Sequence, residues 1–161
     1  MKISRECQSC AECCNGWVKI TVENYEASPG NPCPYSTGNG CANYENRPVD
    51  PCRNFMCGWV QSNSPLPDWM KPNEANVIVI FEKFRYQGVP VDLAVPTGRK
   101  IPQRSIEWLK KNAEQSGRPL IFFENTKQNK KYTGDSLLFV HGPVEFQTYV
   151  NQRMEEGKTV W

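Results

Sequence analysis

The segment Cys7-Gln8-Ser9-Cys10-Ala11-Glu12-Cys13-Cys14 determines how the N-terminal part of this chain is organised. Two residues between successive cysteines let both thiolates turn toward one centre from a tight loop, as in zinc knuckles and iron–sulfur loops. Four more cysteines follow at wider spacing: Cys33, Cys41, Cys52 and Cys57. All eight cysteines of the 161 residues therefore lie between positions 7 and 57, and residues 58–161 contain none.

Metal binding explains this distribution better than a disulfide framework does. Disulfides usually cross-link the whole of a small secreted chain, whereas these cysteines occupy about one third of the sequence. The start, Met1-Lys2-Ile3-Ser4-Arg5, shows no apolar secretory segment. We therefore expect a cytoplasmic protein, in which a reducing environment favours metal-bound thiolates. Free buried thiols and cytosolic disulfides are the weaker alternatives.

The candidate ligands are all thiolates, because residues 1–60 contain no histidine. A carboxylate or a water molecule could complete such a site. Soft thiolates select zinc, copper(I) or iron–sulfur clusters rather than magnesium or calcium. The Cys7-Cys10-Cys13 triplet favours an iron–sulfur cluster, whereas two groups of four cysteines favour two zinc ions. The sequence leaves the metal and the number of sites, one or two, open.

The adjacent pair Cys13-Cys14 bears on how two sites would be connected. Neighbouring side chains point apart in extended chain, so binding one ion through both would strain the backbone. We expect each to serve a different metal atom, or one to be a spare, which favours a polynuclear centre or two neighbouring sites. If each site draws ligands from both cysteine groups, metal closes the loop of residues 15–32 and residues 7–57 fold only as a unit.

The cysteines and their surroundings resemble the bacterial CxxCxxCC cysteine-cluster family, the YkgJ-type zinc- or iron-chelating domain. The match covers about residues 5–60 and consists of Cys7, Cys10, Cys13, Cys14, Cys33, Pro34, Cys41, Tyr44, Arg47, Pro48, Cys52, Arg53, Phe55 and Cys57. Three residues separate Pro48 from Cys52, where many members have two. The resemblance implies metal chelation by the eight cysteines. Flagellin lysine-N-methylases, which are longer, carry a similar cysteine box and give a precedent for enzymatic use.

The other residues of this box have physical interpretations of their own. Arg47 and Arg53 are candidates to donate hydrogen bonds to thiolates or to backbone carbonyls, and the alternative for Arg47 is an ion pair with Glu45. Their positive charge would offset the net negative charge of a four-thiolate metal site. Three aromatic residues are expected to form an apolar shell that keeps water from the centre: Tyr44, Phe55 and Trp59.

The remainder of the chain has ordinary strand and helix patterns. Strands are expected at residues 17–22, 76–86, 89–95, 120–123 and 136–141. Helices are expected at residues 103–115, with Gly117 as the stop, and at residues 146–154. These patterns predict an α+β protein in which an irregular cysteine-rich metal-binding lobe, residues 1–60, packs on a small mixed or antiparallel sheet with one or two helices. A Pro-rich connector, residues 61–75, leads to the α+β region, residues 76–161, and the parts may form one compact unit.

Charge and hydropathy restrict the partners. Ionising eight thiolates and adding two divalent ions would turn the formal net charge of +2 negative, which disfavours nucleic acid. The longest aliphatic and aromatic run, residues 77–81, is too short to span a bilayer. The single histidine, His141, is interpreted as a structural residue at a strand end rather than a catalytic base. The basic residues Lys127, Lys130 and Lys131 are interpreted as a solvated hairpin tip.

The leading functional hypothesis is a cytoplasmic metal-binding protein that holds zinc or an iron–sulfur centre. One alternative is an enzyme that uses the cluster for group transfer or redox chemistry. Another is a zinc-folded module that recognises a protein partner. The sequence contains no other catalytic motif that would decide whether the chain is an enzyme.

Overall fold

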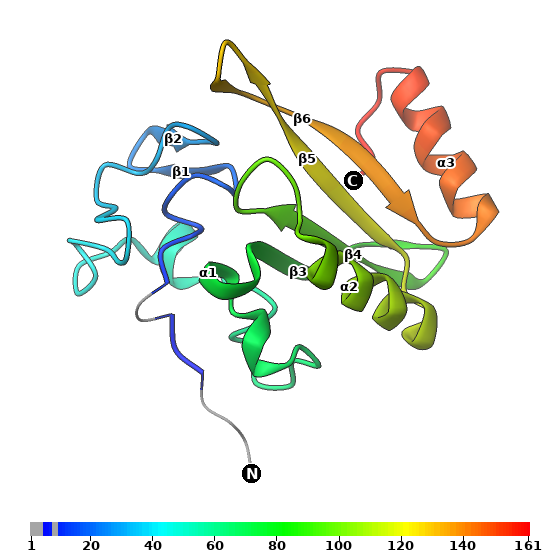
Figure 1. Cartoon of the computed structure of the whole chain (residues 1–161), viewed down its shortest axis with the longest axis horizontal. Coiled ribbons are helices and arrows are strands. Elements are labelled where there is room, and N and C mark those ends of the chain that lie inside the picture. The colour runs from blue at the N-terminus through cyan, green and yellow to red at the C-terminus, as the bar shows by residue number, and fades with distance from the viewer. Residues whose placement is uncertain (1–4, 8–9) are drawn as a thin grey trace.

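A four-stranded mixed sheet forms the centre of this computed structural model, which describes residues 5–7 and 10–161 (Figure 1). The fold is α+β, as the sequence predicts. The helices and strands, in chain order, are β1 (Ile20–Val22), β2 (Tyr25–Ala27), η1 (Val49–Arg53), η2 (Asp68–Met70), α1 (Pro72–Ala75), β3 (Val77–Tyr86), β4 (Val89–Pro96), α2 (Gln103–Ser116), β5 (Leu120–Gln128), β6 (Lys131–His141) and α3 (Val144–Glu155).

The sheet has the strand order β3-β4-β5-β6. Strands β3 and β4 form the expected antiparallel hairpin, whose turn places Gln87 and Gly88 at positive φ. Strands β4 and β5 are parallel, because α2 carries the chain back across the sheet before β5 begins. Strand β6 pairs antiparallel with β5 and forms one edge, while β3 forms the other.

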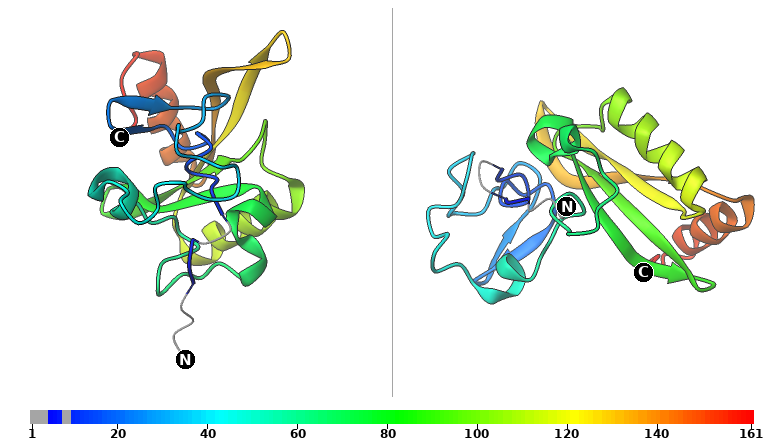
Figure 2. Two further views of the ribbon diagram at one scale, coloured as in Figure 1. Left: turned by 90° about the vertical axis from the view of Figure 1, so that its left-hand side faces the viewer. Right: turned by 90° about the horizontal axis from the view of Figure 1, so that it is seen from below.

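Helices cover both faces of the sheet (Figure 2). On one face, α2 packs through Ile106, Leu109 and Ala113 against β3, β4 and β5, whose buried residues there are Val77, Val79, Ala94 and Leu120. On the opposite face, α3 packs through Phe146 and Val150 against Ile78, Val91, Leu93, Val95 and Ile121. Alternation of buried residues along β3 and β4 allows this, since successive strand residues point to opposite faces.

Helix α2 begins and ends where the sequence predicts. It starts after Pro102, which has no N–H for the helix to satisfy, and it ends at Gly117, whose φ of 68° is the left-handed conformation of a helix cap. The terminal helix α3 is slightly longer than the predicted 146–154. Among residues 5–7 and 10–161, no helix has both the length and the apolar character needed to cross a bilayer.

Strands β5 and β6 extend far beyond their predicted ranges, 120–123 and 136–141. The added residues form a hairpin that turns at Asn129 and Lys130, both at positive φ. Its residues are mostly exposed and polar, so apolar periodicity could not indicate them. The basic residues around this turn lie at the expected hairpin tip, where the ammonium group of Lys127 sits 4.5 Å from the centre of the Tyr132 ring.

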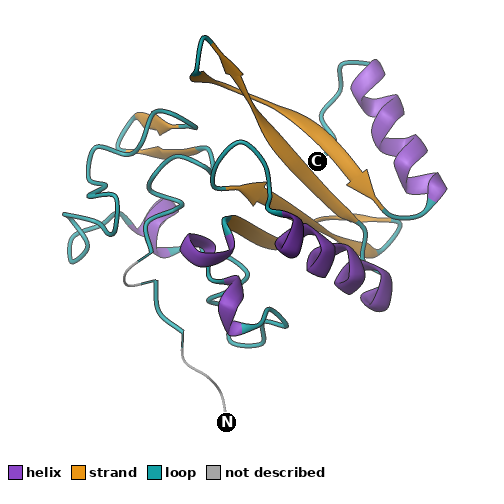
Figure 3. Ribbon diagram, viewed as in Figure 1, coloured by secondary structure: helices purple, strands orange, loops and turns teal. Residues whose placement is uncertain are grey.

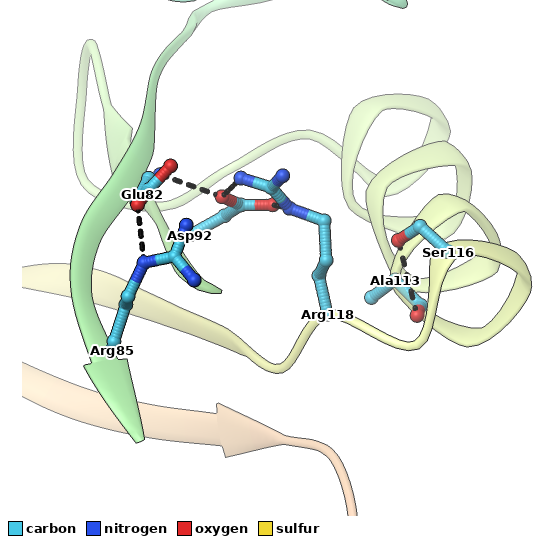
Figure 4. Close-up of polar contacts among 6 residues, drawn as sticks. All are labelled: Glu82, Arg85, Asp92, Ala113, Ser116 and Arg118. Carbon is cyan, nitrogen blue, oxygen red and sulfur yellow. Dashed lines mark hydrogen bonds and ion pairs between the residues drawn. The ribbon is translucent and has the colours of Figure 1, made fainter. Parts of the chain in front are cut away.

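A buried carboxylate accepts a hydrogen bond at the register shift of the β3–β4 hairpin (Figure 4). The register shifts between Ile80 and Phe84, which leaves the backbone N–H of Glu82 without a strand partner. Asp92, only 5% exposed, accepts this N–H at 2.8 Å. It also accepts Nε and Nη2 of Arg118 at 2.9 and 2.6 Å, so one ion pair connects β4 to the segment between α2 and β5.

Replacing Arg118 by alanine is expected to lower the free energy of unfolding by roughly 2–4 kcal/mol, because the Asp92 carboxylate would remain buried without its partner. Denaturant titration measures this change. The matched control is Arg85→Ala, which removes an exposed ion pair with Glu82 and should change stability by less than about 1 kcal/mol. If both substitutions lowered the free energy of unfolding equally, the buried Asp92 carboxylate would not need Arg118 to compensate its charge.

The part of the chain that we call the cysteine segment, residues 5–60, consists mainly of loops over its described residues, 5–7 and 10–60 (Figure 3). It packs beside the sheet through Trp17, Val18 and Phe55, which join the apolar cluster of β3, β4 and α3. The predicted strand at 17–22 is shorter, and it pairs with a strand that the sequence pattern did not indicate, β2. Glu23 and Asn24, both at positive φ, form the turn between them.

Candidate metal site

All eight cysteines of the chain line a single cleft. It has a volume of about 610 Å³ and lies where the cysteine segment meets β3 and α1, represented by Ile78 and Pro72. The cysteines that line it are Cys7, Cys10, Cys13, Cys14, Cys33, Cys41, Cys52 and Cys57, and none of them forms a disulfide. The fold thus places side chains that are up to 50 residues apart in the sequence on one surface.

The donor chemistry of this cleft fits a thiophilic metal, although the thiols are not gathered around one point. Within residues 5–7 and 10–161, no three Cys, His, Asp or Glu side chains form a ready-made coordination group. Eight sulfur donors with few competing oxygen donors nonetheless match zinc or iron–sulfur ligation rather than calcium or magnesium. The eight-ligand assignment therefore remains a prediction.

The N-terminal cysteines lie on a series of tight turns. The N–H of Cys10 donates to the carbonyl of Cys7 at 2.9 Å, and the N–H of Gly16 donates to the carbonyl of Cys13 at 3.3 Å. We expected the side chains of Cys13 and Cys14 to point apart because neighbouring side chains do so in extended chain. The chain is not extended at these two residues. Because the chain turns, the thiols of Cys13 and Cys14 hydrogen-bond to each other.

This hydrogen bond separates the two adjacent thiols chemically. The bond from Cys13, helped by the positive charge of Arg47, lowers the pKa of Cys14 to about 7. The same bond, together with burial, raises the pKa of Cys13 well above its usual value. In the metal-free protein, Cys14 is therefore the acceptor and the more nucleophilic of the two.

Cys14 of the metal-free protein is expected to react with iodoacetamide much faster than Cys13. Its rate should rise with pH and reach half its maximum near pH 7, because the thiolate is the reacting form. The rate at Cys13 should rise only at higher pH. Isotope-coded alkylation with mass spectrometry measures both sites in one sample, and faster reaction at Cys13 would contradict the donor and acceptor roles.

We divide the cysteines into two sets by the thiols that act on Cys7, Cys13 and Cys52; Cys14 acts across the division, on both Cys7 and Cys13. What we call the sheet-side set consists of Cys7, Cys10, Cys13 and Cys57. What we call the loop-side set consists of Cys14, Cys33, Cys41 and Cys52. After burial, the charge of Cys57 is the largest cause that raises the pKa of Cys7. The thiols whose charge raises the pKa of Cys52 all belong to the loop-side set: Cys14, Cys33 and Cys41.

Apolar packing divides five of the eight cysteines in the same way. Cys13 and Cys57 pack against the cluster that α3 and the sheet share. Cys14 and Cys52 pack instead against a small separate cluster of three buried residues: Val22, Ala27 and Cys33. The two adjacent cysteines therefore belong to different sets, and their hydrogen-bonded thiols lie where the sets meet.

Backbone N–H groups point at two thiols of the sheet-side set. The thiol of Cys10 accepts from the N–H of Glu12 and from that of Asn73, which belongs to α1. The thiol of Cys57 accepts from the N–H groups of Trp59 and Val60. Burial still raises the pKa of both thiols, but these donors favour the thiolate form that binds metal.

The two arginines of the cysteine segment hold its loops through backbone carbonyls, one of their predicted roles. Arg53 donates to the carbonyls of Arg47 and Glu45 at 3.1 and 3.0 Å. Arg47 donates to the carbonyl of Tyr44 at 2.7 Å, and its guanidinium lies 3.8 Å from the centre of the Tyr44 ring. An ion pair between Arg47 and Glu45 does not occur among the described residues.

The charge of Arg47 acts on both sets of thiols. It lowers the pKa of Cys7 in the sheet-side set and of Cys14 and Cys52 in the loop-side set. In each case it opposes burial, which disfavours the charged thiolate. Arg47 thus supplies a positive charge in the cleft that acts on cysteines of both sets.

Of the three aromatic residues expected to shield the centre, Tyr44 and Phe55 line the cleft, whereas Trp59 does not. Phe55 lies with Cys13 and Cys57 in the apolar cluster beside the sheet. Tyr44 is 37% exposed and stacks on Arg47. Trp59 packs against the α2 side of the sheet and carries the guanidinium of Arg5 over its ring at 4.7 Å.

Glu12 is a residue of the cleft that sequence reasoning did not single out. Its carboxylate accepts hydrogen bonds from the side chains of Trp17 and Asn15, and burial raises its pKa. The only sequence signal is its position inside the cysteine box. His141, by contrast, does not line the cleft; it ends β6, and its Nε2 lies 3.1 Å from the Glu114 carboxylate.

Comparisons with known proteins add no further assignment. No protein-family model matches the chain, and neither the curated proteins nor the solved structures contain a match. The resemblance to the cysteine-cluster family therefore stays a prediction based on the residues of the box.

Proposed function

We propose that this chain is a metal-binding protein that holds zinc or an iron–sulfur centre through its eight cysteines. The observation that carries the proposal is that all eight, from Cys7 to Cys57, line one cleft. Such convergence of soft donors has no advantage for packing alone, since a buried cysteine behaves as a small apolar residue wherever it lies. A reducing compartment such as the cytoplasm suits thiols that must remain available to metal.

The ligands of the proposed centre are crossed between the two halves of the cysteine segment. Neighbouring thiols and apolar packing support one site built from the sheet-side set and one from the loop-side set. Each site then combines cysteines of the N-terminal box with cysteines of the later group. Arg47 offsets part of the negative charge that the thiolates of both sites bring together.

Metal and sulfide analysis of protein purified without oxygen tests the proposal. Brown protein with iron and acid-labile sulfide would identify an iron–sulfur centre, and colourless protein with zinc would identify tetrathiolate zinc. Anaerobic purification matters because air can destroy a labile cluster and let zinc replace it. Protein that contains no metal, and that takes up neither zinc nor iron and sulfide when these are supplied, would refute the proposal.

A second candidate, a cluster-dependent enzyme, is favoured by the size of the cleft. Its volume of about 610 Å³ lies in the range of sites for small organic molecules, and apolar side chains such as Val60 and Ile20 line part of it. An enzyme of this kind needs a coordination position open to substrate, whereas a structural site is closed. Spectroscopy that finds each metal atom saturated by cysteine would count against this candidate.

A further inference from the structure

We infer that the two cysteine sets are unequal: the sheet-side set holds its metal tightly, and the loop-side set is the exchangeable site from which metal is released first. The inference rests on the proposed function and deepens it, because it assigns retention and release to different residues. It depends on how each set is anchored, which differs in three respects: attachment to the sheet, backbone donors and the size of the apolar support.

Two ligands of the sheet-side set, Cys13 and Cys57, belong to parts of the chain that pack against the sheet. Cys57 precedes Gly58, whose N–H donates to the carbonyl of Val79 in β3 at 2.5 Å. A side chain at Gly58 would meet the ring of Phe81 at 2.7 Å, so the chain passes directly against the strand. Cys57 therefore keeps its position whether or not the loops around it are ordered.

Backbone donors further favour metal on this side. The N–H groups that point at the thiols of Cys10 and Cys57 come in part from α1 and from Trp59, both of which pack with the sheet. Hydrogen bonds to metal ligands from surrounding groups typically change metal affinity by about 10–100-fold. In the loop-side set, by contrast, the groups that lower the pKa of Cys14 are the thiol of Cys13 and the charge of Arg47 rather than a backbone N–H.

The loop-side set has much weaker support. Cys33 is buried, but its cluster contains only two other buried residues, Val22 and Ala27. The strands on either side of that cluster have three residues each. Among the described residues, one backbone hydrogen bond, from Cys33 N–H to the carbonyl of Cys14 at 2.8 Å, joins a cysteine of the N-terminal box directly to one of the later group. Metal binding on this side must therefore order the loops, which lowers the net affinity.

Zinc release from the full-length, zinc-saturated protein tests the inference. With a chromogenic chelator in excess, release should occur in two phases of equal amplitude whose rates differ by roughly 10–100-fold. Samples alkylated after the fast phase should carry label on Cys33, Cys41 and Cys52, while Cys10 and Cys57 remain protected. Cys41→Ser should remove the fast phase alone, and the control His141→Ala should keep both phases.

The possible failures are distinguishable. A single phase in which all eight cysteines become labelled together would overturn the inequality but leave metal binding intact, as would early labelling of Cys10 and Cys57. Protein that binds no zinc would overturn the proposed function itself. Because the labelling experiment uses the unmodified chain, the inference remains testable even if Cys41→Ser does not fold.

Discussion

The Cys52→Ser variant is expected to lose the metal of the loop-side set. The loops of the cysteine segment should then unfold, while the four-stranded sheet remains folded. Structural zinc in small domains contributes roughly 10–16 kcal/mol of apparent binding free energy. The loop-side cluster buries only three side chains, Val22, Ala27 and Cys33, which contribute about 5 kcal/mol at most before chain entropy is counted. Metal, rather than apolar burial, must therefore order these loops.

Metal analysis combined with hydrogen exchange measures both effects. Protection should be lost between β1 and η1 and retained in β3 and β4. Cys10→Ser should also lower the metal content, since the crossed arrangement draws on both cysteine groups. The control is His141→Ala, because His141 lies at the end of β6 and does not line the cleft. Full metal content and native protection in Cys52→Ser would refute the crossed arrangement.

Gly16→Ala is expected to destabilise the cysteine segment by roughly 3–5 kcal/mol and to lower its metal content. Gly16 follows the Cys13-Cys14 pair and has a φ of +94°, which disfavours any residue with a Cβ. An added methyl group would also overlap the carbonyl oxygen of Ser28, and the nitrogen of the same residue would lie 3.0 Å away. The backbone at Gly16 or at Ser28, which follows β2, would have to move.

Gly38→Ala is the matched control for this prediction. Gly38 also has a positive φ, +89°, but an added Cβ there meets nothing within 4 Å. This variant should therefore show only the conformational penalty, about 1–2 kcal/mol, and keep its metal. Equal destabilisation in the two variants, measured by denaturant titration of the holoprotein, would mean that the contact with Ser28 is unimportant.

The sequence predicts the second half of the fold well, because its elements are organised by apolar packing. Helix α2 shows the periodic stripe of Ile106, Leu109 and Ala113 and the stop at Gly117, all of which the structure confirms. The outer parts of β5 and β6 escape prediction because they pair with each other in solvent. Strand β2 escapes because three residues are too short to show any alternation.

The sequence indicates the cysteines of the candidate site but not the groups that contact them. Cysteine spacing indicated the eight cysteines, all of which line the cleft. It could not indicate that Asn73, more than 60 positions after Cys10, directs its N–H at that thiol, since only the fold brings α1 to the cleft. Nor could it indicate the turn at Cys13 and Cys14, because local spacing alone does not distinguish a turn from extended chain.

X-ray absorption spectroscopy at the metal edge tests the central claim most directly, because it identifies the atoms that surround the metal. On anaerobically purified protein, we expect sulfur as the only ligand element supplied by the chain, with metal–sulfur distances near 2.3 Å if the metal is zinc. The expected iron spectrum of a cluster would add iron neighbours to the same sulfur shell. A first shell dominated by nitrogen or oxygen would contradict ligation by the eight cysteines.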